Sequence, residues 1–101
     1  MLLTFFVHLN ATRRWLSLSA RDRERFVAER LGPILGRYPE VAGRFYDAEA
    51  FSASPSDIAV FEAPEPEVFA AFWDEVRDTE VFTAPFFEVV GVYPAFASDA
   101  L

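Results

Sequence analysis

Four residues in three separate stretches of the sequence carry side chains suited to acid–base chemistry: His8, Arg44, Tyr46 and Asp57. Histidine titrates near neutral pH, so His8 could move a proton, and Asp57 could do the same as a carboxylate. A guanidinium such as Arg44 binds carboxylate or enolate oxygens, and the phenol of Tyr46 can donate to a developing oxyanion. We therefore expect these four residues to form a catalytic group on a small-molecule substrate.

Each of these residues also has a purely structural explanation. His8 can be a hydrogen-bonded strand residue, Arg44 can pair with Glu88 across a sheet, and Tyr46 can be an interface ring with a solvated hydroxyl. The sequence has one histidine and no cysteine, which does not suit a zinc site. His8 together with Asp57 or Glu88 would still offer ligands to another metal ion.

The hydrophobic pattern predicts which elements position these residues. Alternating apolar residues predict strands over 3–9, 44–50, 57–62 and 86–92, and helical spacing predicts helices over 19–38 and 66–78. The order β-α-β-β-α-β predicts a ferredoxin-like α+β fold, with a four-stranded antiparallel sheet and both helices on one face. We expect a single domain over 1–94, ended by Tyr93-Pro94, and a tail over 95–101. Gly32-Pro33 should interrupt the first helix.

Strand alternation assigns the side chains to the two faces of the sheet. Residues 3, 5, 7 and 9 are all apolar and should face the helices, and on the third strand we expect Ile58 and Val60 to do the same. The uncovered face then holds the four catalytic candidates and a substrate-binding set, which comprises Phe6, Asn10, Phe61, Phe86 and Glu88. The acids of the segment 47–52 form either a lip of this site or a solvated strand end.

Composition limits the partners. The chain has 101 residues and a formal net charge of −7, so phosphate backbones and anionic membranes should be repelled. The absence of cysteine fits a reducing compartment, and we expect a cytoplasmic protein. Seventeen per cent of the residues are aromatic, more than one core layer needs. The surplus predicts a second apolar surface, either a homodimer interface or a ligand pocket.

Several stretches resemble the darcynin family of small bacterial proteins. They are residues 5–10 (FFVHLN), 38–39 (YP), 44–53 (RFYDAEAFSA), 56–59 (SDIA), 77–79 (RDT) and 86–90 (FFEVV), with the string over 47–53 the most specific. The darcynin family is uncharacterised, so this resemblance implies no activity. More distantly, the element order resembles the dimeric α+β barrel superfamily, which includes cofactor-independent monooxygenases, polyketide cyclases, isomerases and haem-handling proteins. That resemblance implies a homodimer formed through the sheets.

These observations predict a small enzyme with no bound organic cofactor, of cyclase, isomerase or monooxygenase type. Its substrate would be a hydrophobic oxygenated or aromatic small molecule, such as a secondary metabolite, held in a barrel cavity. The alternative is a non-catalytic module that binds a small molecule or a partner protein through its aromatic sheet face. A cavity lined by His8, Arg44 and Asp57 would favour the enzyme.

Overall fold

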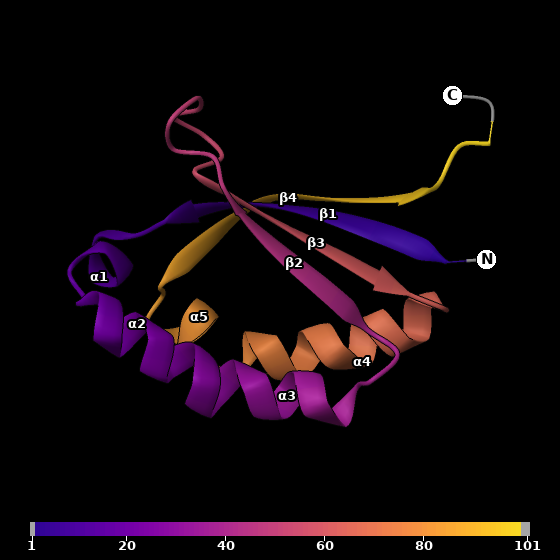
Figure 1. Ribbon diagram of the computed structural model, residues 1–101, viewed down its shortest axis with the longest axis horizontal. Helices are drawn as coiled ribbons and strands as arrows, with labels where there is room; N and C mark the ends of the chain where they lie inside the picture. The colour runs from indigo at the N-terminus through magenta and orange to yellow at the C-terminus, as the bar shows by residue number, and fades with distance from the viewer. Residues whose placement is uncertain (1, 100–101) are drawn as a thin grey trace.

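The computed structural model describes residues 2–99, which form one sheet with all helices on one side of it (Figure 1). The strands are β1 (Leu3–Ala11), β2 (Ala42–Asp47), β3 (Asp57–Ala63) and β4 (Phe87–Phe96). They are antiparallel and lie in the order β2-β3-β1-β4. The predicted ferredoxin-like α+β fold is therefore confirmed.

The helical layer consists of two long elements and two short ones. The first long element is continuous through α2 (Ala20–Phe26), the π-helical turn η1 (Val27–Leu31) and α3 (Gly32–Arg37). The second is α4 (Pro66–Arg77). The short helices are α1 (Arg13–Leu16) and α5 (Glu80–Thr83), both in segments for which we predicted neither a helix nor a strand.

The first long helical element shows how its sequence shapes it. Ser19 caps α2, because its hydroxyl accepts a hydrogen bond from the backbone N–H of Asp22 at 3.1 Å. Further along, Pro33 has no N–H to donate to the carbonyl four residues back. The preceding turn is wider than an α-turn, and the N–H of Gly32 bonds to the carbonyl of Val27. The helix is thus not interrupted at Gly32-Pro33 as predicted; it continues through this pair, and the irregularity is the π-helical turn directly before it.

Two predicted strand ends were wrong. The second strand stops at Asp47, where the chain turns back so that the N–H of Phe51 and of Ser52 bonds to the carbonyl of Ala48. The fourth strand continues through Pro94 to Phe96. Proline has no N–H to donate to a neighbouring strand. It is tolerated in β4 because β4 is an edge strand, where the nitrogen of Pro94 can point to the side that has no partner strand. The expected domain boundary at residue 94 thus lies inside β4, and part of the expected tail, residues 100–101, lies outside the described residues.

The core lies between α4 and the two central strands. The ring of Phe5 on β1 stacks on Phe69 of α4 with centroids 3.9 Å apart, and Phe72 beside it is 2% exposed. On the outer side of α4, the carboxylate of Glu75 accepts hydrogen bonds from Tyr38 and Arg37, which hold the pKa of Glu75 below its ordinary value. The same hydrogen bond to Glu75 raises the pKa of Tyr38. These contacts join the two long helical elements at the surface.

The pairing of β1 with β3 decides which side chains face the helices. Val7 lies opposite Ala59 and Leu9 lies opposite Asp57, and directly opposed residues of an antiparallel pair share a face. Val7 is fully buried beneath the helices, so Ala59 and Asp57 also face the helical layer. Ile58 and Val60 face away from it. Our prediction for the third strand was therefore wrong by one residue, which inverts the whole strand.

Candidate functional site

Three of the four catalytic candidates lie on the uncovered face of the sheet. His8 is opposite Ile58 in β3, and Tyr46 is opposite the same Ile58 from the other side. Arg44 is opposite Val60. The imidazole of His8 makes an edge contact with the ring of Tyr93, with centroids 5.0 Å apart.

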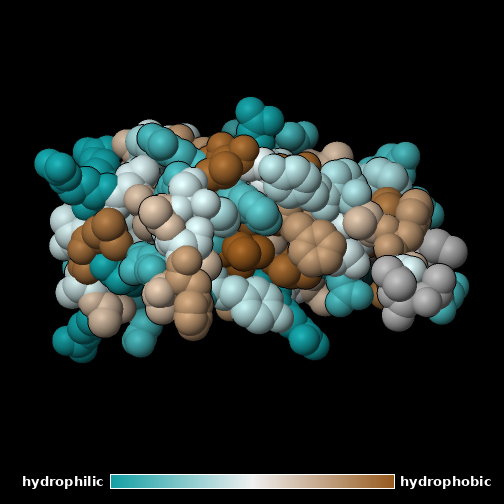
Figure 2. Space-filling view, turned by 90° about the horizontal axis from the view of Figure 1, so that it is seen from above, coloured by the Kyte–Doolittle hydropathy of each residue, from teal (hydrophilic) through white to brown (hydrophobic). Residues whose placement is uncertain are grey.

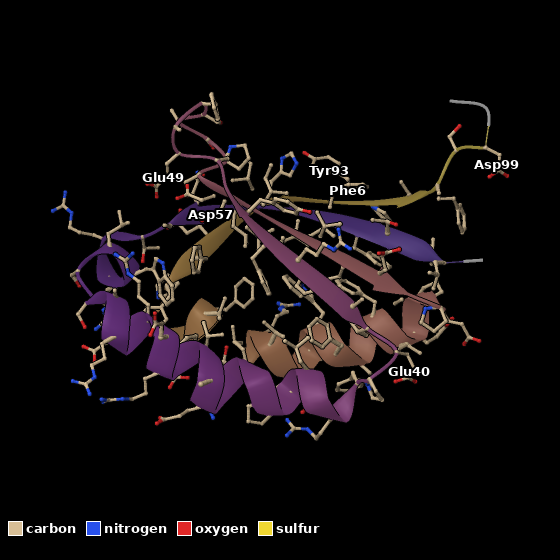
Figure 3. All side chains as sticks on the ribbon, in the orientation of Figure 1. Phe6, Glu40, Glu49, Asp57, Tyr93 and Asp99 are labelled. Carbon is tan, nitrogen blue, oxygen red and sulfur yellow. The ribbon has the colours of Figure 1, made fainter. Side chains whose placement is uncertain are left out.

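Phe6 lies opposite Tyr93, and Figure 3 shows both side chains on the side of the sheet away from the helices. The ring of Tyr93 lies across Gly91, where a Cβ atom would be 2.6 Å from the Tyr93 hydroxyl oxygen. Glycine at position 91 thus allows Tyr93 to lie flat on this face. The uncovered face is aromatic, as predicted for Phe6 and Tyr46, and it also carries polar residues, among them Arg44 and Glu62.

Asp57 lies on the opposite face. Its register partners are Leu9 in β1 and Asp47 in β2, and all three face the helices. The sheet itself therefore stands between the Asp57 carboxylate and the side chains of His8, Arg44 and Tyr46. The predicted catalytic group is not brought together, because a one-residue error in the alternation of β3 placed Asp57 on the wrong side.

The substrate-binding set is also divided. Phe61 is 3% exposed and faces α4, and Phe86 contacts the rings of Trp15 and Phe26 in the helical layer. Both were expected on the uncovered face. Glu88 does lie on that face, opposite Asn10, but β4 and β2 are the two outer strands of the sheet. Glu88 and Arg44 are thus separated by three inter-strand spacings of about 4.8 Å each, too far to pair.

Asn10 has a structural role. Its side-chain amide donates to Ser54 Oγ at 3.0 Å, and its Oδ1 accepts from the backbone N–H of Ser56 at 3.1 Å. The Ser56 hydroxyl is bonded in turn to the backbone N–H of Ala11 at 2.8 Å and to Asp57 Oδ2 at 2.7 Å. These bonds fix the loop between β2 and β3 to the end of β1 and orient the Asp57 carboxylate.

A pocket of about 390 Å³ lies between the sheet and the helices. Its walls are largely apolar and come from both layers. The lining residues are Leu9, Trp15, Phe26, Val27, Leu31, Leu35, Phe45, Tyr46, Asp47, Asp57, Ile58, Ala59, Phe61, Phe72, Trp73, Val76, Val81 and Phe87. This volume is within the range of small-molecule sites, which are typically about 300–1,000 Å³.

The pocket exists because the helices do not fully cover β2. Phe45 lies opposite Ala59 and so faces the helical side, yet 60% of its surface is exposed. Its ring meets the edge of Phe61 at a centroid distance of 5.8 Å. In a filled two-layer sandwich a phenylalanine on the inner face would be buried. The exposure of Phe45 marks the open side of the pocket.

Two carboxylates provide most of the charge at this pocket. Asp47 and Asp57 are directly opposed across β2 and β3 and both line the pocket. Asp47 Oδ1 accepts a hydrogen bond from the backbone N–H of Glu49 at 2.9 Å. Figure 3 shows Asp57 at the end of β3, below the loop that carries Glu49. Within residues 2–99, no group of three or more potential metal ligands is placed to hold a metal ion.

Sequence reasoning missed most of this pocket. Phe45, Trp73 and Trp15 were not among the residues that we assigned to a candidate site from the sequence. Asp47 was considered only as a lip residue or a solvated strand end. The available signal was the aromatic surplus, which predicted a second apolar surface but not its position between the layers.

Comparison with known proteins identifies the family. Residues 1–99 match the family described as darcynin, a domain of unknown function. The chain belongs to the darcynin family. It is 44% identical over 80 residues to Darcynin 1 of Acinetobacter baumannii, a match that covers 79% of this chain and 89% of that protein. It is 49% identical over 63 residues to the darcynin of Chromobacterium violaceum, which covers 62% of this chain and 80% of the relative.

Solved structures share the fold of this darcynin-family chain. A haem-binding protein from Thermus thermophilus superposes with a TM-score of 0.77 at 21% identity, covering 91% of this chain and 38% of that one. A chlorite dismutase variant from Candidatus Nitrospira defluvii gives a TM-score of 0.73 at 14% identity, with coverage of 97% and 40%. The darcynin-family chain thus spans about two fifths of these proteins. Among its described residues, no helix is long and apolar enough to cross a membrane.

Proposed function

We propose that this darcynin-family protein binds a largely apolar small molecule in the pocket between its helices and sheet. The observation that carries the proposal is a pocket of about 390 Å³ whose apolar walls remain open along β2. An apolar cavity with a few polar groups at one end is the usual form of a ligand site. The rings of Phe45, Phe61 and Trp73 suit a flat, aromatic-sized ligand.

The structure supports small-molecule binding better than it supports the enzyme mechanism that we predicted from the sequence. That mechanism needs a proton-moving group and an oxyanion donor in contact with one substrate. Asp57 faces the pocket, whereas His8 and Arg44 face the other side of the sheet. In the part of the chain that the structure describes, no histidine or arginine lines the pocket. The non-catalytic alternative, small-molecule binding, is therefore the function we propose.

The haem-binding neighbour raises the question of whether this pocket suits haem. Haem iron is usually held by histidine, thiolate, methionine or tyrosinate. Among the described residues, the lining contains no histidine, cysteine or methionine, and Tyr46 belongs by strand alternation to the other face. The carboxylates of Asp47 and Asp57 at the pocket would also repel the propionates of haem. These residues do not fit haem, and we assign it no role.

The binding proposal can be tested with phenylpropanol, an uncharged ring-bearing alcohol. Both tryptophans of the chain, Trp15 and Trp73, line the pocket, so bound ligand should change the intrinsic fluorescence. Binding to the folded state alone should also raise the midpoint of thermal unfolding with ligand concentration. If neither signal changes up to the solubility limit, with phenylpropylamine and phenylpropionate equally inactive, the proposal is wrong.

We propose in addition that two copies pair through the uncovered sheet face. Figure 2 looks onto this face and shows apolar residues among polar ones along the middle of the sheet. Phe6 is 40% exposed, Tyr46 49% and Tyr93 53%. Arg44 and Glu62 on the same face provide both signs of charge, so two identical faces can be complementary.

If two copies pair in this way, light scattering should give the mass of a dimer for the unaltered protein. The variant Phe6→Ser should give the mass of a monomer at the same concentration. Leu16→Ser is the matched control, because Leu16 is 51% exposed but lies in the helical layer, and its loss should leave the mass unchanged. A monomer mass for the unaltered protein at high concentration would contradict the pairing.

A further inference from the structure

The polar end of the ligand pocket contains two like charges that face each other. Asp47 and Asp57 are direct cross-strand partners at the last position of the β2–β3 ladder. Like charges at directly opposed positions destabilise a sheet, because their side chains lie about 5 Å apart. The repulsion between these carboxylates lowers the stability of the ligand-free protein. A positive charge bound between them would be attracted to both.

No cationic side chain of residues 2–99 provides this charge. In the described part of the chain, neither Asp47 nor Asp57 is in an ion pair within 4.0 Å, and the ion pairs that this part contains all lie among the helices. The pocket lining contains no arginine, and the sequence contains no lysine. The hydrogen bonds from Ser56 and from the N–H of Glu49 each satisfy one oxygen but bring no charge.

The apolar walls of the pocket, beyond the two carboxylates, indicate the chemistry of the rest of the ligand. From the carboxylates the walls pass to Phe45 and Ala59 and then to Phe61, Phe72 and Trp73, all apolar. A molecule that contacts both ends must carry a positive group attached to an apolar, ring-sized body. Aromatic faces also attract cations, so the ammonium group of such a molecule is favoured at the aromatic rim as well.

We propose that the pocket is selective for amphiphilic amines, which are apolar molecules with one protonated amino group held between Asp47 and Asp57. This inference rests on the proposed binding function and names the ligand class of that same site. The formal net charge of −7 supports it, because an acidic surface attracts cationic ligands and repels anionic ones.

The test uses three compounds with the same phenylpropyl body and different charge: phenylpropylamine, phenylpropanol and phenylpropionate. Their affinities are measured by tryptophan fluorescence and by calorimetry at low salt. We expect the amine to bind at least about tenfold tighter than the alcohol and the propionate to bind weakest. Raising the salt concentration should reduce the preference for the amine, because the carboxylates are partly exposed.

The double variant Asp47→Asn/Asp57→Asn removes both charges and keeps the side-chain shapes. It should bring the affinities for amine and alcohol to within about twofold of each other, as expected when the charge term is removed. Glu62→Gln is the matched control, since Glu62 lies on the same strand but faces the uncovered side, and it should preserve the preference.

Each outcome separates this inference from the function on which it rests. Equal binding of all three compounds would contradict the selectivity for amines and leave the binding function standing. A preference for the amine that survives in the double variant would show that the two carboxylates do not cause it. Failure of all three compounds to bind would contradict the binding function itself.

Discussion

Phe72→Ala is expected to destabilise the protein by about 3–5 kcal/mol, the usual cost of removing a buried phenylalanine ring. The side chain is 2% exposed and lies among the rings of Tyr38, Phe61 and Phe69, at centroid distances of 5.9, 5.2 and 6.0 Å. It also borders the pocket, so the space left by the ring joins an existing cavity and cannot easily collapse. For a domain with a total stability of about 5–15 kcal/mol this is a severe loss.

Urea unfolding followed by circular dichroism measures this change directly, and the midpoint of thermal unfolding should fall by about 12 °C or more. Phe51→Ala removes the same ring from a residue that is 96% exposed and should change the stability by less than about 0.5 kcal/mol. Similar losses in the two variants would mean that α4 is not packed as described.

Ala59→Leu should abolish most ligand binding without unfolding the protein. Ala59 is 2% exposed to solvent, but it lines the pocket at the centre of β3, between Phe45 and Val7 of the neighbouring strands. A leucine there would extend into the pocket space that the ligand needs. We expect the affinity for phenylpropylamine to fall at least about tenfold, which corresponds to about 1.4 kcal/mol.

The stability of Ala59→Leu should stay within about 1 kcal/mol of the unaltered protein, because the added methyl groups fill an existing cavity. Ala70→Leu adds the same groups to an exposed position on α4 and should leave binding unchanged. Undiminished affinity in Ala59→Leu, measured on a variant shown to be folded, would mean that the ligand does not enter this pocket.

The sequence predicted the architecture well because the order of hydrophobic periods depends on local pattern alone. The orientation of the first strand could also be predicted, since Phe5 and Val7 belong to a set that is entirely apolar, whereas the other set contains His8 and Asn10. Burial of one face then leaves a single choice.

For the third strand, the sequence pattern allowed both orientations. Both of its alternating sets are apolar in part, one with Ile58 and Val60 and the other with Ala59 and Phe61. Its true orientation depends on the contact of Phe61 with α4 and on its register with Phe5, which are long-range features. Because Asp57 belongs to this strand, the candidate site was misplaced together with it. The pocket itself depends on how far the helices stand from β2, which no local pattern encodes.

The wide turn Val27–Leu31 has a consequence for insertions and deletions in this family. It holds one residue more than a regular helix would need, and each residue advances an α-helix by about 100°. Because the extra residue is taken up within this turn, the residues on either side of it keep the orientation of one regular helix. Deleting one residue there would give a regular α-helical turn and would leave Ile34, now 4% exposed, facing the sheet and Tyr38 beside Phe72 and Glu75. Homologous sequences that differ in length between Ser19 and Tyr38 should therefore carry the insertion or deletion in this turn.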